Sequence, residues 1–313
     1  MTAAPVATPL ETRTLARPAR TPTQDALRAL ARTRSAIIGA SILGVLIILA
    51  IFAPLIAPYP PNETLIGIEH VFSRQAPCIH LLGCPADQPQ HILGMDGNVR
   101  DFFSRVVYGS RVSLMIGFAT VGFAIVLGTL FGAIAGYAGG LADNAIMRCM
   151  DVLLAFPALL LAIAIVTVLG PGLINALLAI GIVAIPAYAR VARASVLAVK
   201  EQEYVTAARM IGARPNRILF QNILPHTLTP LIVQGTLGIA SAILDAAALS
   251  FLGLGAQPPL AEWGSMLGAE RNQVFSAPHL VFFPGLMIML TVLSFNLLGD
   301  GLRDALDPRL RKF

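Results

Sequence analysis

The stretch that decides the fold runs from residue 203 to residue 225 and reads EYVTAARMIGARPNRILFQNILP. It is a basic, polar segment between two long apolar ones. Ala207 and Ala208 are neighbours on a helix-forming run, and their small side chains would let a partner surface approach closely. Gly212 can adopt a positive φ and turn the chain into a second short helix, which Pro225 is expected to end at the membrane edge. This layout predicts a place where another protein docks.

The composition outside this segment predicts an integral membrane protein. The 313 residues are 56% hydrophobic and 12% charged, and the mean hydropathy is +0.75. That leaves too little polar surface to cover a soluble globule of this size. The basic residues lie at the ends of apolar segments and not on a patch interleaved with aromatic residues, so the pattern argues against nucleic-acid binding.

The apolar runs predict an all-α fold of six transmembrane helices. The first run, residues 35–56, has no charged residue, and at ~1.5 Å per residue it is long enough for a ~30 Å hydrocarbon core. We interpret it as an uncleaved first helix. The run 152–189 is too long for one helix, and Gly170, Pro171 and Gly172 divide it into helices three and four. The other expected spans are residues 111–142, 227–255 and 280–298.

The charges predict the orientation of these spans. Of the 22 lysines and arginines, 17 lie in the N-terminal tail, the loops 137–150 and 190–226, and the C-terminus. That asymmetry places both termini and the basic loop in the cytoplasm. The expected parts are a disordered cytoplasmic tail (1–34), the first helix (35–57), an extracytoplasmic segment (58–110), a core of five helices (111–302) containing the loop 190–225, and a cytoplasmic tail (303–313). Trp263 suits an interfacial position within the polar segment 256–278.

The sequence contains no motif for holding a nucleotide. There is neither a GxxxxGK run followed by Ser or Thr nor a GxGxxG between a strand and a helix, so any ATP hydrolysis would take place on a partner. Ser265, Ser294 and His226 form no nucleophile-and-base pattern, and a hydrolase within the membrane would need both groups at one depth. We therefore expect no catalytic residues and no cofactor in this chain.

Two features inside the spans suggest packing and transport roles. Gly128, Gly132 and Gly136 fall four residues apart, on one helix face where another helix can approach closely. Asp245 is the acidic residue deep inside a span, which makes it a candidate for the translocation path or its gate; the alternative is a buried carboxylate hydrogen-bonded to a neighbouring helix. Asp151 has a simpler interpretation, an i, i+3 pair with Arg148.

The cysteines of the outer segment leave three possibilities. Cys78 and Cys84 would form a disulfide in an oxidising compartment. Free thiols are the second possibility. A metal site with nearby His70, His80 or His91 is the third, although the spacing is not a standard zinc pattern. Cys149, inside an apolar helix, is expected to be a small core residue.

The docking segment resembles the cytoplasmic loop of inner-membrane permeases from binding-protein-dependent ABC importers. That family has Glu-Ala-Ala, three residues, Gly, nine residues and Ile-x-Leu-Pro. The chain matches at Ala207, Ala208, Gly212, Leu224 and Pro225, and it departs at Thr206 and Asn222. Three further stretches resemble the second permease of dipeptide and oligopeptide transporters: HILGMDGNVRDFFSRVVYGSRVSL (91–114), ILDAAALSFLGLGAQPPLAEWGSML (243–267) and NLLGDGLRDALDPRLR (296–311).

The resemblance implies a type I ABC importer permease in a bacterial inner membrane. It implies four kinds of partner: a homologous second permease, two cytoplasmic ATPases that bind ATP and Mg²⁺, an extracytoplasmic solute-binding protein and a peptide substrate. In that scheme the loop, with Glu203, Ala207, Ala208, Gly212, Leu224 and Pro225, rests in a cleft of one ATPase. Nickel, glutathione or haem are alternative ligands. A structural or channel subunit and an intramembrane enzyme are alternative classes.

Overall fold

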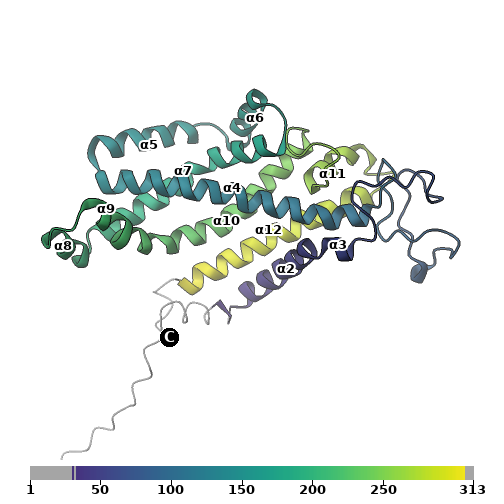
Figure 1. The fold of residues 1–313 in the computed structure, drawn as a ribbon, viewed down its shortest axis with the longest axis horizontal. Helices are drawn as coiled ribbons and strands as arrows, with labels where there is room; N and C mark the ends of the chain where they lie inside the picture. Colours follow the sequence, from purple (N-terminus) through teal and green to yellow (C-terminus); the bar gives the residue numbers. More distant parts are fainter. Residues whose placement is uncertain (1–29, 32, 307–313) are drawn as a thin grey trace, which may run out of the picture.

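The computed structural model describes residues 30, 31 and 33–306, so the expectations for residues 1–29, 32 and 307–313 lie outside this range. The described chain is helical, with three isolated β-bridges and no strand. Figure 1 shows an elongated bundle of long helices, with α8 near one end and irregular segments around α11 at the other. Five helices are long and apolar enough to cross a membrane, and a bent pair makes a sixth span. The predicted all-α class is confirmed.

The first expected helix is two helices. α2 covers Arg34–Ile51 and α3 covers Ala53–Ile56. The break falls at Phe52, two residues before Pro54, whose ring cannot continue the backbone hydrogen bonds of α2. α2 packs beside α12, which covers His279–Leu306 and therefore continues beyond the expected end at residue 298.

α4 begins earlier than the hydropathy predicts. It covers Phe102–Ala138, whereas the charge-free run starts only at residue 111. Asp101 caps the helix by accepting a hydrogen bond from the backbone N–H of Ser104 at 2.7 Å. The 37 residues of α4 span ~55 Å, so the helix projects beyond a ~30 Å hydrocarbon core.

Gly128, Gly132 and Gly136 form the face of α4 that packs on α7 (Leu173–Lys200). A Cβ at Gly132 would lie 2.2 Å from the backbone oxygen of Ala189, and at Gly128 one would lie 2.6 Å from the Cβ of Tyr188. Neither contact leaves room for a methyl group. The two helices therefore meet at backbone distance along this row.

The third expected span is bent, and this corrects two expectations. Residues 137–148 are not a loop, and no straight helix starts at residue 152: α5 (Gly140–Leu154) and α6 (Ala158–Leu169) meet at 91°. Pro157 lies at the bend, where its ring disfavours a helical Phe156. The predicted division at Gly170–Gly172 is confirmed, because α6 ends at Leu169 and α7 begins at Leu173.

The fifth span corrects the expected end of the docking segment. α8 covers Glu203–Met210, and α9 (Pro215–Arg217), the π-helical turn η2 (Ile218–Ile223) and α10 (Leu224–Phe251) follow one another as a single apolar span. Pro225 therefore lies in the first turn of α10 and ends no helix. The N–H of Leu224 bonds to the carbonyl of Leu219, five residues back, and this wider turn accommodates the proline ring.

The remaining elements cover the end of the bundle opposite α8. We call residues 57–101 and 252–278 the cap; they contain η1 (His80–Leu82), α11 (Trp263–Glu270) and η3 (Arg271–Gln273). Trp263, the first residue of α11 within the cap, is fully buried and does not present its ring to a membrane interface, contrary to expectation. Its indole N–H donates to the carbonyl of Val106 at 3.0 Å, and Gly109 leaves room for its ring.

Candidate functional site: a docking loop and a charged cap

α8 ends in a Schellman motif that requires Gly212. The N–H of Gly212 bonds to the carbonyl of Arg209 at 3.0 Å, and the N–H of Ala213 bonds back to the carbonyl of Ala208 at 3.1 Å. Gly212 has φ of +79°, and no atom lies within 4 Å of a Cβ built there. The restriction at this position is therefore conformational and not one of space.

The underside of α8 is apolar and packs on α7 and η2. Val205 and Ala208 join a buried cluster with Val196 of α7, Ala133 of α4 and Ile223 of η2. Ala208 is thus part of this core. The sequence had suggested that Ala208 and Ala207 together present a bare surface, and the structure corrects this for Ala208. One cluster thus joins the loop to α4, α7, η2 and the first residue of α10.

The outer face of α8 is open. Glu203 and Ala207 are exposed, and the apolar side chains of Met210 and Ile211 are 85% and 84% exposed at its tip. Leu224 is half-buried against the underside cluster, and Pro225 is exposed beside it. Of the six residues expected to rest in a cleft of an ATPase, the structure places Ala208 and Leu224 in packing positions. The other four lie on the open surface.

Ion pairs attach α5 to α7 near the loop. Asp151 bonds to Arg190 at 2.7 Å, and Asp143 pairs with Arg193. The expected pair of Asp151 with Arg148 does not form, because Asp151 turns toward the neighbouring helix. These contacts join the bent span to the helix that carries the loop.

A buried carboxylate organises the cap. Glu262 caps α11 by accepting hydrogen bonds from the backbone N–H groups of Gly264 and Ser265 at 2.9 and 2.8 Å. The hydroxyl of Ser113, on α4, donates to it at 3.2 Å. Burial raises the pKa of Glu262, and the hydrogen bonds oppose that rise. Sequence reasoning missed this residue, although an acidic side chain directly before Trp-Gly-Ser is a helix-start signal.

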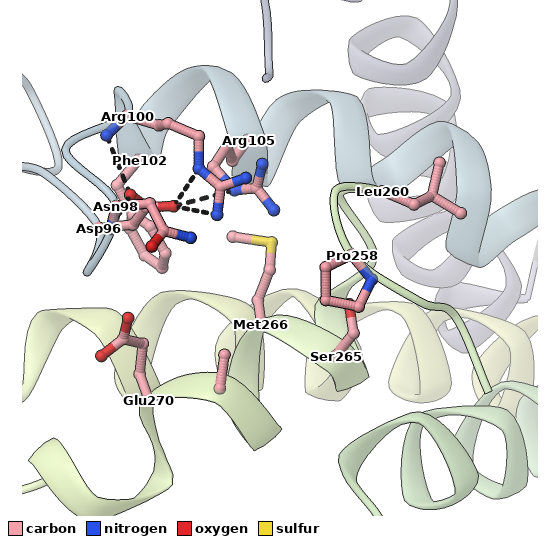
Figure 2. Close-up of a pocket in the computed structure, with 11 residues that line it drawn as sticks. Asp96, Asn98, Arg100, Phe102, Arg105, Pro258, Leu260, Ser265, Met266 and Glu270 are labelled. Atoms are coloured by element: carbon pink, nitrogen blue, oxygen red, sulfur yellow. Dashed lines mark hydrogen bonds and ion pairs between the residues drawn. The ribbon is translucent and has the colours of Figure 1, made fainter. Parts of the chain in front are cut away.

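Figure 2 shows Arg100 and Arg105 converging on the carboxylate of Asp96, beside a cavity of about 90 Å³. The closest nitrogen–oxygen distances to Asp96 are 2.7 and 3.4 Å. On the other wall Glu270, from α11, pairs with Arg74 at 2.8 Å. Because every one of these charges has a partner, the cavity suits water better than a charged substrate.

His91 ties the outer segment to α4. Its two ring nitrogens lie 2.8 Å from Asp101 and 3.1 Å from Glu69. Burial by itself would lower the pKa of His91, but the hydrogen bonds and charges of Asp101 and Glu69 together outweigh it and raise the pKa. Burial and the bond to Glu69 raise the pKa of Tyr59 to about 12.

Cys78 and Cys84 are joined by a disulfide. The backbone N–H of Cys78 also donates to the carbonyl of His91 at 2.9 Å, which places the bridge next to the histidine cluster. Among the described residues no group of three or more His, Cys, Asp or Glu side chains could hold a metal ion. Cys149 is free and exposed, which corrects its expected core position.

Asp245 lies on α10 six residues before the helix ends at Phe251, nearer to the cap than expected. It is half-buried and has no hydrogen bond or ion pair within residues 33–306, so no neighbouring helix of this chain holds it. The serines considered for hydrolysis are engaged elsewhere: Ser265 bonds to the carbonyl of Glu262 and Ser294 to that of Thr291.

Comparison with known proteins places these features in a family. Residues 128–312 match the model of the binding-protein-dependent transport system inner membrane component, and residues 21–77 match the N-terminal TM domain of oligopeptide transport permease C. A dipeptide transport system permease protein of Alkalihalophilus pseudofirmus is 48% identical over 93% of this chain and 91% of that protein. A glutathione transport system permease protein of Pectobacterium atrosepticum is 50% identical over 71% of this chain and 73% of its own length.

The fold also resembles a solved transporter structure. A chain of the inward-facing MetNI methionine ABC transporter superposes with a TM-score of 0.53 at 19% identity, over 64% of this chain and 96% of that one. At this identity the likeness concerns the fold alone. Taken with the family match, it shows that the chain belongs to the family of binding-protein-dependent transport system inner membrane components.

Proposed function

We propose that the chain is a permease subunit of an ATP-driven importer of dipeptides and other short peptides. The observation that carries this proposal is the 48% identity to a dipeptide permease along nearly the whole length of both chains. Glutathione permeases match at similar identity, one at 50% over 71% of the chain and another at 45% over 93%. Glutathione is itself a small peptide, so both kinds of relative point to the same class of substrate.

We further propose four partners: a homologous permease, two cytoplasmic ATPases that bind ATP and Mg²⁺, and an extracytoplasmic solute-binding protein. The open face of α8 supports an ATPase contact. Met210 and Ile211 expose apolar surface next to the small side chain of Ala207, an arrangement that suits a protein cleft better than water.

In this mechanism the ATPases move the loop and the helices follow. The Schellman motif at Gly212 fixes the angle between α8 and the fifth span. The apolar cluster under α8 then carries its displacement to α4, α7 and α10 as a rigid-body motion. The substrate passes between the two permeases, and this chain makes and breaks no covalent bond.

The proposed orientation places the loop and both termini in the cytoplasm and the cap outside. The excess of lysine and arginine at the loop end supports it. A disulfide between Cys78 and Cys84 suits an oxidising outer compartment. A reporter that fluoresces only in the cytoplasm should be bright when fused after Phe313. A correctly inserted fusion that stays dark would show that the orientation is the opposite of the proposed one.

The test of the proposed function is uptake of a labelled dipeptide in cells that lack only this chain. Uptake should disappear on deletion and return with the intact gene, and an excess of unlabelled dipeptide should compete in the parent strain. Glutathione, a longer peptide and nickel serve as the other competitors. Unchanged dipeptide uptake in a strain without a second peptide importer would refute the substrate, and the competitor that acts would identify its replacement.

A further inference from the structure

One face of α10 carries a row of polar residues toward the cap. Ser241 lies seven residues after Gln234, and Asp245 lies four residues after Ser241. At 100° per residue they fall within a narrow arc of the helix. Ser241 is exposed and the other two are half-buried, so neighbouring helices of this chain leave the row partly uncovered.

The polar groups of the row have no partners in the described part of the chain. None of the three side chains forms a hydrogen bond or an ion pair there. Two other hydroxyls of α10 do: Thr227 donates to the carbonyl of Leu224 and Thr236 to that of Ile232, both at 2.8 Å. Ser241 differs from them because its hydroxyl is left for another molecule.

Tyr188 of α7 adds a fourth polar group. Its ring is buried, and its hydroxyl would lie 1.9 Å from a Cβ at Gly238. Gly238 is in the same arc of α10, between Gln234 and Ser241, so the hydroxyl reaches the row through the space that the glycine leaves. It forms no hydrogen bond with any described residue. The row from Gln234 to Asp245 is thus ~16 Å long.

Such a row cannot face lipid at low cost. Polar groups without partners are costly to place in hydrocarbon, and an unpaired carboxylate costs more than a neutral group. Intramembrane carboxylates therefore usually face a bundle interior or a water-filled cavity. The neighbouring Leu244, 48% exposed on the same helix, provides the lipid-compatible surface beside the row.

We propose that this row lines the translocation path and that Asp245 binds the α-ammonium group of the passing peptide. The assignment rests on the proposed function. Asp245 is the row's only charged group, and it lies at the end nearest the cap, where an imported substrate would enter. A peptide ammonium can supply the charge-assisted hydrogen bonds that the carboxylate lacks within this chain. Gln234 and Ser241 then offer neutral hydrogen bonds along the way.

Cysteine labelling tests the position of the row. In a Cys149→Ala background, with the Cys78–Cys84 bridge intact, the importer carrying Gln234→Cys or Ser241→Cys is reconstituted in nanodiscs with its partners. A charged, thiol-specific reagent should modify both cysteines, and dipeptide should slow the reaction. The matched control Leu244→Cys should stay unmodified. Failure to label either position, with or without ATP, would refute the path and leave the row buried against the second permease.

Asp245→Asn tests the ammonium contact. The dipeptide concentration that half-protects Ser241→Cys should rise about tenfold or more, because a charged hydrogen bond is replaced by a neutral one. Asp245→Glu should restore most of the protection, and the amount of assembled complex serves as the control. An unchanged half-protecting concentration in Asp245→Asn would overturn the contact. If glutathione protected and dipeptide did not, the row would stand and the proposed substrate would fail.

Discussion

The loop and the cap differ in the share of polar groups among their buried residues. Beneath α8 the buried residues are apolar, with Val205 and Ile223 at the centre of the cluster. In the cap the groups that organise the chain are buried and polar, as His91, Asp101 and Glu262 show. The cap also has a disulfide, whereas the cysteine nearest to the loop end, Cys149, is free.

The difference suits the mechanical roles that we propose for the two regions. A loop that receives force needs a defined angle and broad contact with the helices that it moves, and backbone hydrogen bonds with apolar packing supply both. A cap that must keep its shape while the helices move is held better by directional bonds, since hydrogen bonds and ion pairs specify partners as well as distance. The following predictions test this contrast, from the largest effect to the smallest.

Trp263→Ala should cause the largest loss of stability. It removes a fully buried ring and its hydrogen bond to Val106 from the cap, and changes of this kind cost about 3–5 kcal/mol. Thermal unfolding of the purified chain in detergent, followed by circular dichroism, measures the effect. Tyr204→Ala on α8 is the matched aromatic control; its side chain is partly exposed and the expected cost is about 1 kcal/mol. Equal shifts of the unfolding temperature in the two variants would contradict the contrast between the cap and the loop.

The cap should lose stability as the pH rises. The pKa of His91 is raised in the folded protein, so its contribution is complete below the ordinary value of 6.5 and is lost as the pH rises through the folded value. Trp263 is the chain's single tryptophan, so its fluorescence reports unfolding of the cap. The unfolding midpoint should fall with rising pH in the unaltered chain, and this decline should be much weaker in His91→Gln. The same decline in the unaltered chain and in His91→Gln would show that His91 is not the source of the pH dependence.

Asp151→Asn should have the smallest effect. The Asp151–Arg190 pair is about half exposed on both sides, and exposed pairs of this kind contribute about 0–1 kcal/mol. The unfolding midpoint should change little, and adding salt to the unaltered chain should change it equally little. A loss of stability as large as that of Trp263→Ala would mean that ion pairs stabilise the loop end as they stabilise the cap.

Sequence patterns identified the features that depend on neighbouring residues. The turn at Gly170–Gly172, the glycine face of α4 and the positive φ at Gly212 each follow from local chemistry at a fixed spacing, and the structure has all three. The family motif located the loop for the same reason. Hydropathy located the apolar runs but not their ends, because capping by Asp101 extends α4 and the π-helical turn carries the fifth span through Pro225.

The residues whose positions the sequence did not predict make contacts with residues far away in the chain. Asp151 pairs with Arg190 and not with Arg148, because α5 folds back onto α7. Trp263 is buried because Gly109, more than 150 residues earlier, leaves room for its ring. The partners of His91 and Glu262 come from several segments, so no local pattern could predict these clusters.

The most direct test of the account concerns Gly212, where the loop would pass force to the helices. Gly212→Val places a β-branched residue at φ of +79°, whereas Gly212→Asn places there a residue that tolerates this conformation. The measurement is ATP-dependent dipeptide uptake by the assembled importer in proteoliposomes, beside its ATPase rate. We predict that Gly212→Val assembles but loses most of its uptake per ATP hydrolysed, and that Gly212→Asn keeps it. Unchanged uptake per ATP in Gly212→Val would contradict the role of the loop in coupling.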